Sequence, residues 1–190
     1  MSTNTAYPAS TASTSTWRVA PSVPVATGVF IAFVVAFIGL MYSSGIDFAD
    51  IFASGENAFR AAVIPLLGGS LVLVAFVLWA RWDFVFKDPE RMPMSRAMWV
   101  PVVIFSLAII GHFAAVDWAK VDSTLILAVV CAGVLVGFAE ETLFRGIILR
   151  SLRTNLRPEA WVMLISSLWF GFFHLTNLIV GAPISSVGVQ

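Results

Sequence analysis

Charged residues are scarce in this chain. Of its 190 residues, 12% are charged and 59% are hydrophobic, whereas soluble domains carry about 25% charged and about 45–50% apolar residues. The net charge is zero, so bulk charge gives no sign of a nucleic-acid partner. The excess of apolar residues is best explained by contact with a lipid bilayer.

Cysteine and N-terminal basic residues are also lacking. The single cysteine, Cys131, lies in an apolar run. It cannot form an intrachain disulfide and is expected to be a small buried hydrophobe. Residues 1–16 contain no Lys or Arg, so they lack the basic region of a signal peptide. Their richness in Ser, Thr and Ala predicts a disordered polar tail.

What the chain has instead is long apolar stretches. Each is long enough to cross a hydrocarbon core of about 30 Å, which needs about 20 helical residues. In lipid the backbone must be paired within the segment, and these stretches do not alternate as the strands of a β-barrel do. They predict an all-α, polytopic transmembrane helix bundle. Five spans are expected, over approximately residues 22–43, 61–80, 98–118, 124–149 and 160–180.

The spans divide the chain into three parts. Residues 1–16 form the tail, and residues 17–123 hold the first three helices. Residues 124–190 hold the fourth and fifth helices and the start of a further segment. Nine of the eleven Lys and Arg residues fall on one side of the membrane if the N-terminus is cytoplasmic. This asymmetry predicts a multi-pass protein of the cell membrane with a cytoplasmic N-terminus.

Ionisable residues inside the last two spans are the best guide to chemistry. Each costs at least about 2.5–3.5 kcal/mol at a helix centre, so each is expected to have a function or a partner. Glu141 and Arg145 are four residues apart, in the favourable order for an ion pair. Glu140 points about 100° away from Glu141, and a poorly solvated carboxylate is a better base than one in water. His174 in the fifth span is its expected partner.

The depths of Glu140 and His174 set a condition on the fourth span. Counted at 1.5 Å per residue, His174 lies about 21 Å from the cytoplasmic edge. If the fourth helix continues to Leu149, with Arg150 at the interface, Glu140 lies about 15 Å deep. Tilt can absorb the remaining difference of about 6 Å. The fourth helix is therefore predicted to run beyond the two glutamates and to be longer than a perpendicular span.

These motifs resemble those of a known family. Glu140-Glu141-x-x-x-Arg145, with Phe-Arg-Gly inside it, is followed by Phe170-x-x-x-His174 at the start of His-Leu. The pair is similar to the motifs of the CPBP family, the CAAX prenyl protease, bacteriocin-processing and abortive-infection membrane proteins. The resemblance covers approximately residues 124–190.

The resemblance implies an intramembrane endopeptidase of the glutamate type. Glu140 would be the general base that activates water together with His174. Glu141, tied to Arg145, would orient the site, and Phe170 would pack beside His174. The substrate would be a peptide or protein cut near a membrane anchor, such as a prenylated C-terminus or a leader peptide.

The family's third motif, a His with Asn or Asp four residues on, is not present after His174. We therefore expect the chain to be part of a longer protein, and whether these 190 residues are active is left open. Asn177 lies three residues after His174, which is the wrong spacing to replace that motif. A divalent metal such as zinc, held by Glu140, Glu141 and His174, is also open, although no His-Glu-x-x-His motif is present.

Alternative interpretations remain at this stage. The same fold could serve as an inactive binding or immunity protein, or as a transporter or proton relay that uses the intramembrane glutamates and histidine. Gly68-Gly69-Ser70 matches the short Gly-x-Ser pattern of rhomboid serine proteases, but close helix packing is the favoured explanation. His112 matches no motif and is expected to form a hydrogen bond to another helix.

Overall fold

A computed structural model describes residues 17–86, 97, 99–118, 121–156, 158–179 and 181–182. The predicted disordered tail, residues 1–16, lies outside this described part, and so does the predicted start of a further segment, residues 181–190, apart from Gly181 and Ala182. Within it, every regular element is a helix, as predicted. Four helices are long and apolar enough to cross a membrane, and a shorter apolar helix accompanies them.

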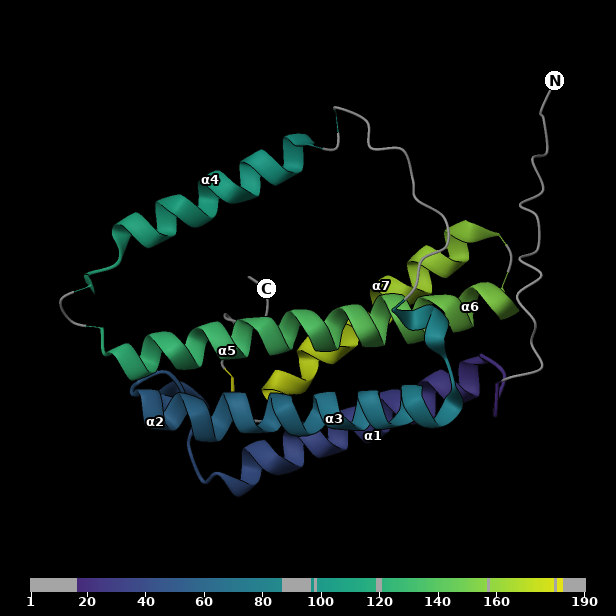
Figure 1. Cartoon of the computed structure of the whole chain (residues 1–190), viewed down its shortest axis with the longest axis horizontal. Helices are drawn as coiled ribbons and strands as arrows, with labels where there is room; N and C mark the ends of the chain where they lie inside the picture. Colours follow the sequence, from purple (N-terminus) through teal and green to yellow (C-terminus); the bar gives the residue numbers. More distant parts are fainter. Residues whose placement is uncertain are drawn as a thin grey trace.

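The helices follow the chain in a simple order (Figure 1). Three of them are built from consecutive segments that join end to end. Their bounds are α1 Val23–Ser43; α2 Gly55–Ala58, η3 Phe59–Val63 and α3 Ile64–Ala80; α4 Trp99–Ala115; α5 Ser123–Glu140, η7 Glu141–Ile148 and α6 Leu149–Asn155; and α7 Glu159–Leu175 with η8 Thr176–Leu178. Short 3-10 turns, η2 Phe48–Asp50 and η4 Asp83–Val85, lie in the connections.

The second predicted span begins earlier than expected and contains a π-helical segment. The helix extends over Gly55–Ala80, and the π-helical η3 ends at Val63, two residues before Pro65. Proline has no N–H and its ring clashes with the preceding turn of an α-helix. A local change to π-helical pairing accommodates such an interruption without ending the helix.

The helix of the fourth span is longer than the apolar run that predicted it. It extends without a break over Ser123–Asn155, which is 33 residues and corresponds to about 50 Å. The prediction that it continues past the two glutamates to Arg150 is confirmed. Because this length exceeds a hydrocarbon core of about 30 Å, the helix has to tilt or project into water.

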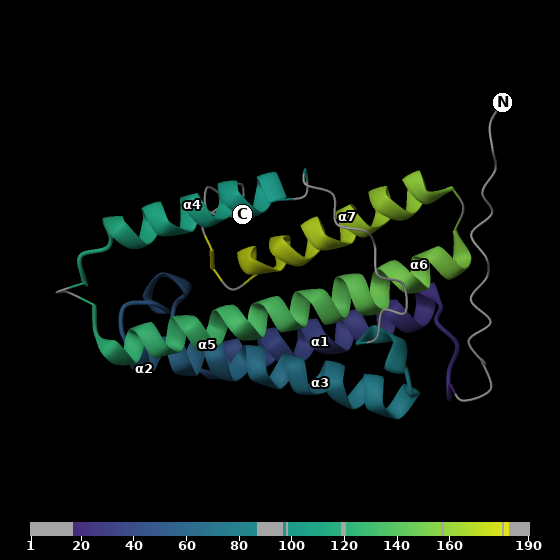
Figure 2. The same ribbon diagram turned by 45° about the horizontal axis from the view of Figure 1, so that its top comes forward.

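The core of the bundle is formed by α1, α3 and the α5–α6 helix, with α7 lying across them (Figures 1 and 2). Its fully buried side chains include Phe33, Leu73, Leu143 and Ile147. Trp82 closes one end of the core, because its ring is buried and its Nε1–H donates to the carbonyl oxygen of Val19 at 2.9 Å.

The third predicted span differs from the others. It forms the 17-residue helix α4, which is shorter than the predicted run of residues 98–118. Every side chain described in α4 is exposed, and the helix lies apart from the bundle (Figures 1 and 2). An apolar helix with no protein around it has lipid as its natural surroundings.

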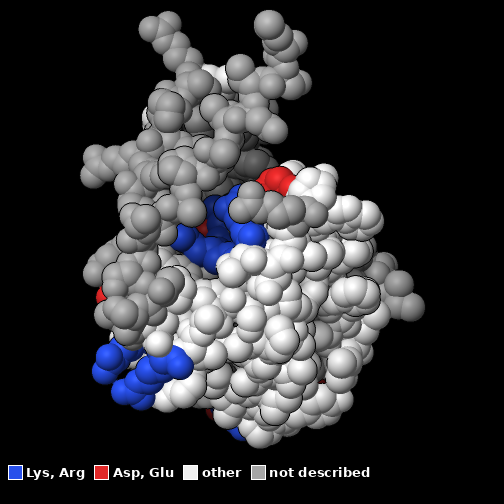
Figure 3. All heavy atoms as spheres, turned by 90° about the vertical axis from the view of Figure 1, so that its right-hand side faces the viewer, with Lys and Arg blue, Asp and Glu red and all other residues white. Residues whose placement is uncertain are grey.

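Basic side chains gather at one end of the bundle. Figure 3 looks at this end and shows clusters of Lys and Arg there. Among the described residues, Arg18 and Arg81 lie near each other, because the Arg18 N–H donates to the carbonyl oxygen of Ala80 at 3.2 Å. Arg150 lies over the ring of Phe84, with its Cζ 5.3 Å from the ring centre. This clustering agrees with the charge asymmetry seen in the sequence.

Candidate active site

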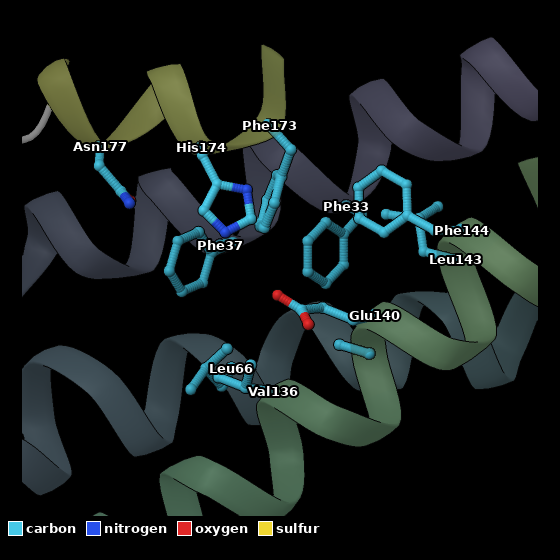
Figure 4. A pocket seen from close by; sticks show the side chains of 11 residues that line it. Phe33, Phe37, Leu66, Val136, Glu140, Leu143, Phe144, Phe173, His174 and Asn177 are labelled. Carbon is cyan, nitrogen blue, oxygen red and sulfur yellow. The ribbon is translucent and has the colours of Figure 1, made fainter. Parts of the chain in front are cut away.

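A cavity of about 280 Å³ lies between the helices that carry the two motifs. Glu140 comes from the end of α5, His174 from the end of α7, and Asn177 from η8. In Figure 4 the Glu140 carboxylate and the His174 ring point toward each other across this space. The remaining lining residues are apolar: Phe33, Phe37, Leu66, Val136, Ala139, Leu143, Phe144 and Phe173.

Glu140 is the last α-helical residue before the π-helical segment η7. Its side chain is partly buried, so water solvates the carboxylate incompletely. His174 and Glu141 both lie close enough to act on it electrostatically. Helical segments of the π type occur frequently at functional sites, and η7 is a feature that the sequence did not reveal.

Glu141 and Arg145 lie outside the cavity. Arg145 Nη1 is 3.1 Å from Glu141 Oε2, and the side chains are 76% and 59% exposed within the chain. The predicted ion pair is therefore confirmed. Neither residue lines the cavity that Glu140 and His174 share, so the influence of the pair on the site is electrostatic or passes through the helix backbone.

His174 is held by its own helix. Its Nδ1 atom lies 3.0 Å from the carbonyl oxygen of Phe170. A carbonyl oxygen can only accept, so Nδ1 carries the proton. In the neutral ring Nε2 is then left with a lone pair, which can accept a proton from water. The four-residue spacing of the motif is thus one helical turn that fixes the tautomer of the histidine.

Aromatic rings support the histidine from two sides. The Phe170 ring is 4.5 Å from the imidazole, centre to centre, and the Phe173 ring is 5.6 Å away at a near-perpendicular angle. Phe144 of η7 packs edge-on against Phe170 at 5.0 Å. The rings therefore connect the helix that carries the glutamates to the helix that carries the histidine.

Helix α1 supplies a wall of the cavity that sequence reasoning missed. Phe33 and Phe37 line it, and Phe30 packs edge-on against Trp169 of α7 at 5.2 Å. These three rings occupy one face of α1, because residues three, four and seven apart lie on the same side of a helix. The spacing is visible in the sequence, but α1 is apolar on every side and so gives no reason to prefer this face.

Asn177 is fixed by the way η8 ends. Gly181 has a positive φ of 89°. The Ala182 N–H donates to the Asn177 carbonyl oxygen at 3.0 Å, and the Gly181 N–H donates to that of Leu178 at 3.2 Å. This is the pattern of a Schellman motif, in which glycine adopts the left-handed conformation that ends a helix. Tyr42 of α1 also donates to the carbonyl oxygen of Ile179 at 2.8 Å.

The remaining candidates lie away from the cavity. Ser70 is buried, and its hydroxyl has no hydrogen-bond partner within the described part of the chain. A Cβ added to Gly69 would meet the Phe33 ring at 2.7 Å, so the glycine allows close packing of α1 on α3, as the packing interpretation predicted. His112 is exposed on α4 and lies 3.0 Å from the carbonyl oxygen of Ala108, four residues earlier in its own helix. The prediction of a hydrogen bond to another helix is therefore wrong, because α4 lies apart from the bundle and this contact is made within α4.

A metal site finds little support in this arrangement. A catalytic zinc is commonly held by three protein ligands. Of Glu140, Glu141 and His174, only two line the cavity. Among the described residues no group of three or more His, Cys, Asp and Glu side chains is placed to hold a metal ion. The residues described here therefore do not fit a complete metal site.

Comparison with known proteins finds a match in the part of the chain that carries Glu140 and His174. The family model described as type II CAAX prenyl endopeptidase Rce1-like matches residues 122–189. This segment is Rce1-like. The resemblance to the CPBP family is thereby confirmed for the helices that carry Glu140 and His174. The Rce1-like match supports an intramembrane protease at the level of the family. No curated protein and no solved structure matches the chain.

Proposed function

We propose that the cavity between α5 and α7 hydrolyses a peptide bond at the membrane, with water activated by Glu140 and His174. The observation that carries this proposal is that the two side chains point toward each other from separate helices (Figure 4). The Rce1-like match of residues 122–189 supports the same reaction class. The apolar walls favour it too, since they limit water around the carboxylate.

The reaction needs one water and one proton carrier. Glu140 takes a proton from a water molecule in the cavity, and the water oxygen forms a bond to the carbonyl carbon of the substrate. The carbonyl oxygen becomes an oxyanion in a tetrahedral intermediate. As the C–N bond breaks, the proton held by Glu140 passes to the leaving nitrogen. The products are a carboxylic acid and an amine, and Glu140 is ionised again. Transfer of the acid's proton to the amine then gives a carboxylate and an ammonium group.

His174 and Asn177 have supporting roles in this proposal. With its proton on Nδ1, His174 accepts a hydrogen bond from the water at Nε2 and orients a lone pair of the water oxygen toward the substrate. Asn177 lines the same cavity, and its amide group can donate to the developing oxyanion. The Glu141–Arg145 pair stabilises the helix that places Glu140, and Phe170 holds the plane of the imidazole.

The substrate is proposed to be a membrane-anchored polypeptide, such as one with a prenylated C-terminus or a leader peptide. Eight of the residues that line the cavity are apolar, which suits a chain segment that enters from lipid. The basic end of the bundle, with Arg18, Arg81 and Arg150, is proposed to face the cytoplasm of the cell membrane. A cysteine introduced at Arg18 should then react with impermeant maleimide only in inverted vesicles.

The decisive experiment compares two histidines in equivalent local settings. Each lies 3.0 Å from the carbonyl oxygen four residues before it, but only His174 lines the cavity. The purified chain is reconstituted in liposomes with a library of membrane-anchored peptides, and cleavage is followed by mass spectrometry. Glu140→Gln and His174→Ala should each lower the rate at least about 100-fold, the scale of general-base catalysis. His112→Ala should retain it.

Each outcome of this comparison has a clear meaning. Equal cleavage by the wild type and both cavity variants would overturn the proposed mechanism. Peptide binding without cleavage by the wild type would favour the alternative of a binding protein with the same fold. Size-exclusion profiles of all variants must match, so that a loss of folding is not mistaken for a loss of chemistry.

A further inference from the structure

A second cavity, of about 370 Å³, is lined by later residues of the same two segments that line the first. On α1, Phe37 lines the first cavity, and Met41, one turn later, lines the second. At the end of η8, Asn177 lines the first cavity and Leu178 lines the second. In Figure 4, Asn177 lies beyond His174 along the same helical segment. The residues that line it are Met41, Tyr42, Gly45, Ile46, Asp47, Leu178, Ile179 and Gly181.

The second cavity has a different chemical character from the first. Among the residues that line this cavity, Asp47 is the one with a carboxyl group, and its side chain is exposed. Asp47 precedes the short turn η2, but its carboxylate forms no capping hydrogen bond there. The phenol of Tyr42 is engaged with the Ile179 carbonyl oxygen. The carboxylate of Asp47 therefore remains available to a ligand.

The charged side chains of Arg60 and Glu56 do not neutralise the carboxylate of Asp47. Arg60 is a cation near this loop, since its Nη2 donates to the carbonyl oxygen of Ser44 at 3.3 Å. Its Nη1 is also 3.7 Å from Glu56 Oε1. Arg60 and Glu56 together contribute no net charge, so the rim of the cavity has the negative charge of Asp47.

The geometry points to a specificity subsite: we infer that Asp47 binds a basic side chain, Lys or Arg, of the polypeptide that is cut at Glu140 and His174. This inference rests on the proposed function. Asp47 lies beyond the end of α1 at Ser43, in the cavity lined by the residues that follow Phe37 and Asn177. The basic residue should therefore lie within a few positions of the scissile bond.

A charge-reversal experiment tests this subsite. Peptides of one sequence carry Lys, Gln or Glu at each of three positions on either side of the cleaved bond. The ratio of kcat/KM values is measured for the reconstituted chain. At one position Lys should be preferred over Gln by about three- to fivefold, the scale of an exposed ion pair. The preference should shrink in high salt, where such pairs are screened.

Two variants of Asp47 and one control variant test whether the preference for Lys comes from the Asp47 carboxylate. Asp47→Asn should remove the preference for Lys, and Asp47→Lys should replace it with a preference for Glu at the same position. Asp50→Lys is the matched control, because Asp50 is exposed in the same loop but does not line the cavity. The Lys preference should survive in this control.

The results separate the subsite from the reaction. If the wild type cleaves but shows no charge preference, or if Asp47→Lys keeps the Lys preference, the subsite is overturned and the proposed function stands. If the wild type cleaves none of the peptides while it binds them, the proposed function fails, and the subsite fails with it.

Discussion

The Nδ1 atom of His174 donates a hydrogen bond to the carbonyl oxygen of Phe170 at 3.0 Å, and the Phe170 ring lies 4.5 Å from the imidazole. One residue therefore supplies both an acceptor that sets the tautomer and a ring that limits rotation. His112 has the same backbone contact, but the residue four positions before it is Ala108. The ring is what distinguishes the histidine of the cavity from the histidine of α4.

The Phe170 ring is expected to act on the position of His174. Phe170→Ala keeps the carbonyl oxygen but removes the ring, so the imidazole gains freedom and kcat should fall about tenfold, well short of the loss caused by His174→Ala. KM should change little. Phe172→Ala is the control, since Phe172 is exposed on the same helix and is not one of the two rings, Phe170 and Phe173, that contact His174 in the described part of the chain. Equal kcat values for Phe170→Ala and the wild type would show that the ring is only packing.

The two neighbouring glutamates should behave differently. Glu141→Gln breaks the 3.1 Å pair with Arg145 but leaves the cavity lining intact, so cleavage should fall by less than about tenfold. Glu140→Gln should be far more damaging. The comparison uses kcat values from the same peptide. A loss in Glu141→Gln as large as that in Glu140→Gln would place Glu141 in the chemistry itself.

The ion pair between Glu141 and Arg145 can also be tested through its effect on thermal stability. Either Glu141→Gln or Arg145→Gln leaves one charge without its partner next to lipid, which is costly. The double variant leaves no charge. We expect it to unfold at a higher temperature than either single variant, measured by differential scanning fluorimetry in detergent. Additive losses in the double variant would mean that the pair contributes little.

The sequence predicted the parts of the fold that depend on local pattern. Apolar length was enough to locate the spans, and the depths of Glu140 and His174 required the helix that runs through Arg150. The aromatic wall of α1 was not predictable, because an apolar helix has no polar face to indicate which side is buried. For the same reason, the run that forms α4 looked like the others, although this helix lies outside the bundle.

Some features of the site depend on contacts between distant segments. The hydrogen bond from Tyr42 to the Ile179 carbonyl oxygen places the end of η8 beside α1. No pattern in the sequence names the partner of Tyr42. The π-helical hydrogen bonding of η7 is likewise not indicated by the composition of residues 141–148.

Asn177 is expected to stabilise the oxyanion. Asn177→Ala removes the amide donor from the cavity, so kcat should fall about 100-fold or more while KM stays within a fewfold, as for other oxyanion donors. The readout is steady-state cleavage of one peptide. Thr176→Val is the control, because the Thr176 hydroxyl donates to the carbonyl oxygen of Phe173 and does not line the cavity. A rise in KM alone would assign Asn177 to substrate binding instead.

Gly69 is expected to set the shape of the cavity through Phe33. In Gly69→Ala the new Cβ would lie 2.7 Å from Cε2 of the Phe33 ring, and Phe33 is both fully buried and part of the cavity wall. The ring has to move, which should cost about 1–3 kcal/mol of stability and lower cleavage. Gly28→Ala is the matched control, because a Cβ there meets nothing within 4 Å.

A second substitution can restore the space that Gly69→Ala removes. Phe33→Leu in the Gly69→Ala background shortens the side chain that is displaced, so stability and cleavage should both recover relative to Gly69→Ala alone. Thermal unfolding and kcat/KM are measured for the two single variants and the double variant. The coupling between residues in contact is expected to be about 0.5–3 kcal/mol. Strictly additive effects would mean that Gly69 and Phe33 do not act through their contact, and that the close approach of α1 to α3 is not what shapes the site.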